Sequence, residues 1–77
     1  MPTLLLQEGF KFFIYANEHL PKHIHVTKGN GYAKFDLATL DVHYSCLRPA
    51  ELKRALTIAA AHRSEFVRKW DEFFSQG

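Results

Sequence analysis

The chain has 77 residues, of which 47% are hydrophobic and 14% aromatic, and this composition excludes a disordered or collagen-like protein. A single cysteine excludes an internal disulfide framework and predicts a reducing, cytoplasmic environment. The net charge of +2 permits RNA or an acidic partner without requiring either, and no apolar run is long enough to predict contact with a membrane. Because so short a chain builds only a small core, a homodimer or a complex is expected to add stability.

The residues before Pro49 read as strands of one domain that spans residues 1–77. Residues 3–6 form a short apolar run, and residues 10–17 follow a turn as a strand with apolar side chains on both faces. Pro21 closes a loop that contains His19. Residues 40–44 alternate between apolar and polar side chains, as an antiparallel strand with one wet face does.

The segment between these strands predicts a hairpin. Asn30-Gly31 is a strong turn signal, because a two-residue hairpin loop of this type needs positive φ at both positions. With these two residues as the loop, His25 lies opposite Asp36. One face of the hairpin is then apolar, and the other is polar and wet, carrying His23, His25, Thr27, Lys34 and Asp36.

The stretch from Pro49 to residue 75 has no glycine or further proline and reads as helical. Its apolar residues recur every three or four positions. One helix over 49–75 would span about 40 Å, more than the roughly 30 Å diameter of a compact domain of this size, so a break near His62 is favoured. The predicted fold is α+β, a small antiparallel four-stranded sheet with one long or two short C-terminal helices packed on one face.

The most specific chemical feature is the pair His23 and His25. Residues two apart on a strand project to the same side, about 6.5–7 Å apart. Since imidazole titrates near neutral pH, one ring can act as general base and the other as general acid in phosphodiester cleavage. Asp36 is predicted to fix the tautomer of His25. An endoribonuclease is therefore one hypothesis, with phosphate contacts from Lys22, Lys28, Lys34 and Arg63.

Other interpretations of the same residues remain open. Two histidines and Asp36 resemble a two-His-one-carboxylate metal site, and the histidines are also explained as solvated residues of an edge strand. His19 is a further candidate to lean over them. No cofactor motif is present. A non-catalytic interaction module is another possibility, in which the hairpin face or the helical aromatics bind a partner. These aromatics, which could instead belong to the core, are Phe66, Trp70, Phe73 and Phe74.

Four segments together resemble a known bacterial family: FKFFIYANEH, HIHV, GNGYAKFDL and HRSEFVRKWDEFF. The chain is similar to the domain of unknown function numbered four-one-six-zero over nearly its whole length. The resemblance implies a DhiT-like toxin of a type II toxin–antitoxin pair, with a cognate antitoxin-like small protein as its partner. It implies no established mechanism. Lys22 stands where the family commonly has proline, and Arg48 where it often has serine or threonine.

Overall fold

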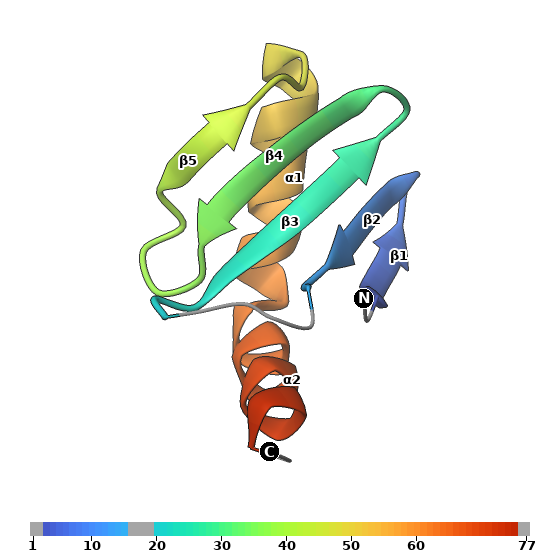
Figure 1. The fold of residues 1–77 in the computed structure, drawn as a ribbon. Helices are drawn as coiled ribbons and strands as arrows, with labels where there is room; N and C mark the ends of the chain where they lie inside the picture. Colours follow the sequence, from blue (N-terminus) through green and yellow to red (C-terminus); the bar gives the residue numbers. More distant parts are fainter. Residues whose placement is uncertain (1–2, 16–19, 76–77) are drawn as a thin grey trace.

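The computed structural model describes residues 3–15 and 20–75. The position proposed for His19 lies outside the described residues. Five strands are followed by two helices, and the strands form one antiparallel sheet in the order β1-β2-β3-β4-β5 (Figure 1). The elements are β1 (Thr3–Gln7), β2 (Phe10–Phe13), β3 (His23–Lys28), β4 (Gly31–Asp36), β5 (Val42–Ser45), α1 (Pro49–Ala61) and α2 (Arg63–Phe74).

The α+β class and the antiparallel sheet are confirmed, but the prediction of four strands is wrong. The N-terminal apolar run is itself a strand, β1, which pairs with β2 as a hairpin. Its two-residue turn consists of Glu8 and Gly9, whose φ angles of 56° and 81° are both in the left-handed region. Such a turn matches the right-handed twist of the flanking strands, so even a five-residue strand can pair.

The predicted hairpin register is also wrong, by two residues. The loop between β3 and β4 consists of Gly29 and Asn30, and Gly29 has the positive φ of 58°. Consequently His23 pairs with Asp36, and His25 pairs with Lys34. Because side chains alternate with a period of two, a two-residue shift changes each residue's partner but not its face.

Both helices cover the same face of the sheet (Figure 1), as predicted. On this side Phe12 of β2 contacts Phe66 of α2, with ring centroids 5.4 Å apart. Alternate residues of the central strands are fully buried here, because each strand presents every second side chain to the helices. The core includes Phe10, Phe12, Ile14, Ile24, Val26, Ala33, Phe35, Leu37, Ala55, Ile58, Ala59, Phe66 and Trp70.

The helical segment breaks at His62, so the favoured prediction of two helices is confirmed. His62 has φ −109° and ψ 12°, yet its N–H still donates to Ile58 and its carbonyl accepts from Phe66. The break therefore does not fold α2 back, and α2 extends past the end of the sheet (Figure 1). The longest dimension is 37 Å, so the molecule is more elongated than the expected diameter of roughly 30 Å. Neither helix is long and apolar enough to cross a membrane.

Candidate functional site

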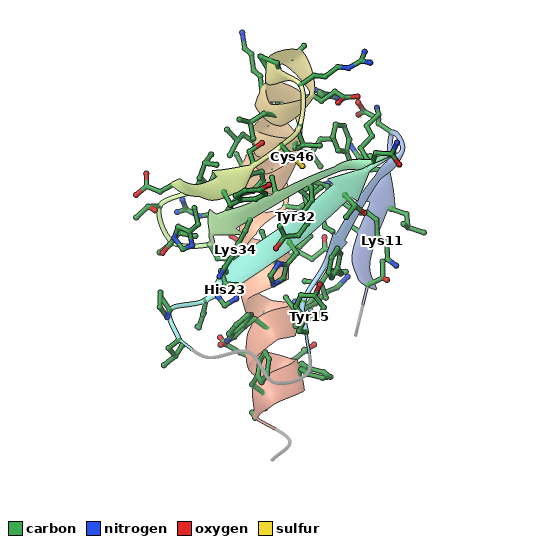
Figure 2. The ribbon with its side chains drawn as sticks, turned by 45° about the horizontal axis from the view of Figure 1, so that its top comes forward. Lys11, Tyr15, His23, Tyr32, Lys34 and Cys46 are labelled. Carbon is green, nitrogen blue, oxygen red and sulfur yellow. The ribbon has the colours of Figure 1, made fainter. Side chains whose placement is uncertain are left out.

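The face of the sheet opposite the helices, called the open face below, is where the conspicuous polar and aromatic side chains gather. Tyr32 and Lys34 lie on this face, and His23 lies at its edge (Figure 2). Strand pairing places neighbouring side chains on the same side, because residues opposite each other share a face. By this rule the open face carries Lys11, Phe13, His25, Thr27, Tyr32, Lys34 and Tyr44.

His25 lies at the centre of the open face. The prediction that its side chain is exposed to solvent is wrong. Its exposed fraction is 4%. The ring stacks on Phe13 at 5.3 Å, and Tyr15 meets it edge-on at 4.6 Å. Nδ1 lies 2.6 Å from the hydroxyl oxygen of Tyr32. The pattern of the hairpin alone predicted an exposed His25. In the structure, aromatic rings from both neighbouring strands enclose it.

His23 is also nearly buried, with an exposed fraction of 7%. Its ring contacts Trp70 of α2 at 5.5 Å and His25 at 5.3 Å, so the two imidazoles do lie side by side. Nδ1 is 2.8 Å from the carbonyl oxygen of Pro21. Because a carbonyl only accepts, Nδ1 of His23 carries the proton and donates it in this bond. His23 thereby connects β3 to the preceding loop and to α2.

Asp36 does not meet His25. Its carboxylate accepts from the backbone N–H groups of Ala38 and Thr39, at 2.7 and 3.0 Å, and so closes the turn after β4. The hydrogen bond from Thr39 is the main cause that holds the pKa of Asp36 below its ordinary value. His43 Nε2 is 4.0 Å away. Within residues 3–15 and 20–75, no three His, Cys, Asp or Glu side chains gather as a metal site requires.

The predicted phosphate contacts do not form one cluster. Lys22 pairs with Asp71 of α2 at 2.7 Å. Lys28 donates to the Glu8 carbonyl at 2.9 Å and lies over the ring of Phe10, on the helix side of the sheet. Arg63 is exposed at the start of α2 and lines a surface groove there. Of the four predicted residues, only Lys34 lies on the open face, directly opposite His25.

Sequence reasoning missed Tyr32, Tyr44, Tyr15 and Lys11 as members of this face. The rings of Tyr32 and Tyr44 are 5.8 Å apart, and Tyr44 pairs with Lys34. Lys11 and Tyr15 alternate along the chain with core residues such as Phe10, Phe12 and Ile14. The sequence did not show that Lys11 and Phe13 of β2 share a face of the sheet with His25 of β3. Only the pairing of Phe13 with His25 shows this.

The predicted partner-binding aromatics divide into two groups. Phe66 and Trp70 are buried in the core, while Phe73 and Phe74 are half-buried and pack against it. The ring of Phe74 lies 4.5 Å from that of Trp70. Together with exposed Leu20, these rings border a groove of about 510 Å³. Its lining residues are Leu20, Lys22, Trp70, Asp71, Phe74 and Ser75.

These features define a small α+β protein with two helices on one face of an antiparallel sheet and an aromatic, lysine-bearing face on the other. The chain belongs to the family described as Domain of unknown function (DUF4160), which matches residues 9–71. The expected family is thereby confirmed, whereas the toxin assignment gains no test from this match. No curated protein and no solved structure matches the chain.

Proposed function

We propose that the protein binds single-stranded RNA across the open face of its sheet. The observation that carries this proposal is the row of aromatic rings on a face that neither helix covers. Tyr44 is 55% exposed and Tyr15 is 41% exposed, so both can stack on bases. Base–aromatic stacking contributes about 1–3 kcal/mol per base and tolerates any sequence.

Two lysines supply the complementary charge. Lys34 lies between His25 and Tyr44 across the strands, and Lys11 contacts the ring of Phe13 at 5.7 Å. Lysine next to a stacking surface is the combination that follows a nucleic-acid backbone while the bases lie on the rings. The net charge of +2 is too small for strong long-range attraction, which favours a short RNA segment over a duplex-binding surface.

The cellular role that we propose is that of the toxin in a toxin–antitoxin pair, which the family resemblance implies. A protein that captures or cleaves RNA would slow bacterial growth on expression. Tyr44→Ala should relieve this inhibition, because it removes an exposed stacking ring without opening the core. Unchanged inhibition by a folded Tyr44→Ala variant would contradict the open face as the toxic surface.

The direct test is a titration of a fluorescent single-stranded RNA at several salt concentrations. Lys34→Gln should weaken binding and lower the salt dependence by roughly 0.7 in the logarithmic slope, which corresponds to one lost phosphate contact on a single strand. Lys53→Gln is the matched control, because Lys53 is exposed on α1, on the other side of the sheet. Equal effects of the two substitutions would contradict a specific role for the open face.

The groove beside α2 supports a second candidate function, that of a protein-interaction module. Leu20 is 75% exposed at one border, and Phe74 forms the other. An apolar groove with the Lys22–Asp71 ion pair at its rim has the apolar centre and polar border typical of protein interfaces. A cognate antitoxin-like protein is the proposed occupant.

A further inference from the structure

The burial of His25 separates it from any RNA on the open face. Its exposed fraction of 4% leaves almost no ring surface for a substrate atom. Within residues 3–15 and 20–75, the charged and titratable groups that face it are Tyr15, His23, Tyr32 and Lys34. A proton can therefore pass between His25 and a bound ribose only through another group that lies between them.

Tyr32 is that group. Its hydroxyl oxygen is 2.6 Å from Nδ1 of His25, which is the short distance of a strong O–H···N bond. The ring is half-buried and lies on the open face (Figure 2). It contacts the exposed ring of Tyr44, with centroids 5.8 Å apart. In the tautomer of His25 that carries its proton on Nε2, Nδ1 accepts the hydrogen bond from the Tyr32 hydroxyl.

A positive charge lies beside this pair. Lys34 is directly opposite His25 on the neighbouring strand, and Tyr44 is on its other side. No ion pair within the described residues neutralises Lys34. A phosphate attracted by the Lys34 ammonium group would thus lie near the Tyr32 hydroxyl, which is the arrangement that phosphodiester chemistry requires.

We infer that Tyr32 is a catalytic residue for RNA cleavage and that His25 acts through it as a buried proton acceptor. This inference depends on the RNA binding proposed above. The ribose 2′-oxygen bonds to phosphorus while its proton passes to the Tyr32 oxygen and the Tyr32 proton passes to Nδ1 of His25. The P–O5′ bond breaks, and the 5′-oxygen takes a proton from water. The imidazolium then returns its proton from Nδ1 to the Tyr32 oxygen while the Tyr32 proton passes to the hydroxide, leaving a 2′,3′-cyclic phosphate and a 5′-hydroxyl.

His23 has a different role from the one that its spacing predicted. Its Nδ1 proton is held by the Pro21 carbonyl and its ring lies against Trp70. These two contacts fix the start of β3, and so hold His25, two residues later in the same strand, in position. The reacting pair is thus His25 with Tyr32, in place of His25 with His23.

The test compares Tyr32→Phe with the parent and with Lys53→Gln, the control substitution on α1, on the other side of the sheet. Each protein is mixed in excess with a labelled single-stranded RNA of mixed sequence, and the cleavage rate is followed from pH 5 to pH 9. Binding is titrated separately with the all-2′-deoxy version, which lacks the nucleophile. Tyr32→Phe should slow cleavage about 10²–10⁴-fold while binding changes less than about threefold. Lys53→Gln should retain parental cleavage.

His25→Gln supplies the readout that a merely structural role would not change. The Gln amide can accept the Tyr32 hydroxyl but cannot take up its proton, so the limb of the pH–rate profile due to imidazole should disappear. Cleavage by Tyr32→Phe within threefold of the parent, or products with a 5′-phosphate, would overturn the inference. A parent that binds RNA but never cleaves it would also overturn it, yet leave RNA binding intact. A parent that binds neither RNA nor the deoxy analogue would overturn both.

Discussion

Leu47 packs directly against the backbone of Gly31. A Cβ atom at residue 31 would lie 2.6 Å from Cδ2 of Leu47 and 3.4 Å from its Cα. Leu47 belongs to the hydrophobic core and, with Arg48, lies between β5 and the start of α1 at Pro49. The absence of a side chain at Gly31 thus lets the connection from the sheet to the helices close against the hairpin.

Gly31→Ala should therefore lower the free energy of unfolding by about 1–3 kcal/mol, the usual cost of forcing extra volume into a packed site. Urea denaturation followed by circular dichroism measures this loss. Gly29→Asn is the control, because no atom lies within 4 Å of its Cβ position and asparagine tolerates the φ of +58°. An unfolding midpoint of Gly31→Ala equal to that of the parent would contradict the close packing.

The same contact explains why the hairpin register could not be predicted. Asn30-Gly31 has the composition of a turn, but Gly31 is needed for packing against Leu47, a residue 16 positions later in the chain. Local turn chemistry contains no information about such a distant neighbour. The apolar and polar faces were nevertheless assigned correctly, since they depend only on alternation along β3 and β4.

Trp70→Ala should lower the free energy of unfolding by about 3–5 kcal/mol, because the ring is 4% exposed and its removal leaves a large cavity. The ring contacts both His23 and Phe74, so the loss would affect the sheet and α2 together. Tyr44→Ala removes an aromatic ring that is exposed, and its effect should be much smaller. Chemical denaturation of the two variants in parallel measures this difference. Equal shifts of their unfolding midpoints would contradict the packing of Trp70 in the core.

The candidate site shows a different limit of sequence reasoning. The spacing of His23 and His25 correctly predicted that their side chains project together, because that is a property of one strand. The burial of His25 depends on Phe13 of β2, on Tyr15 just after it and on Tyr32 of β4, and the ring of His23 packs against Trp70 of α2. Burial is a property of the assembled sheet, so the hairpin alone predicted a wet surface.

Glu8 connects the first hairpin to α1. Its carboxylate accepts from Arg54, with Nε 2.7 Å from Oε1, and this bond is the main cause that lowers the pKa of Glu8 from 4.5 to about 2. A pKa that is lower in the folded state contributes stability above the unfolded pKa, and the contribution is lost as the pH falls through the folded pKa. The stabilisation should thus be complete above about pH 4.5 and disappear near pH 2.

Glu8→Gln should accordingly lower the melting temperature slightly at pH 7, and its difference from the parent should narrow as the pH is lowered from 4.5 toward 2. The effect is small because the pair is exposed to solvent. Glu72→Gln is the control, since it removes a carboxylate that pairs with Arg68 within a single helix turn. A Glu8→Gln difference that is constant from pH 7 to pH 2.5 would show that the ion pair does not connect the hairpin to α1.

The last prediction concerns the groove beside α2. Phe74 is half-buried, and its ring contacts Trp70 at 4.5 Å and Phe73 at 4.9 Å. It is thus held in place by the core while its remaining surface borders the groove beside Leu20. An aromatic side chain fixed in this way is typical of the anchors that dominate protein interfaces.

Phe74→Ala should weaken binding of the proposed antitoxin-like partner by about 2 kcal/mol, roughly a 30-fold loss of affinity. A binding titration measures the loss, and circular dichroism verifies that the variant is folded. Tyr44→Ala, on the opposite face of the sheet, should bind the partner as the parent does. If Phe74→Ala keeps full affinity while Tyr44→Ala loses it, the partner occupies the open face. In that case it would compete with RNA for the surface around His25 and Lys34.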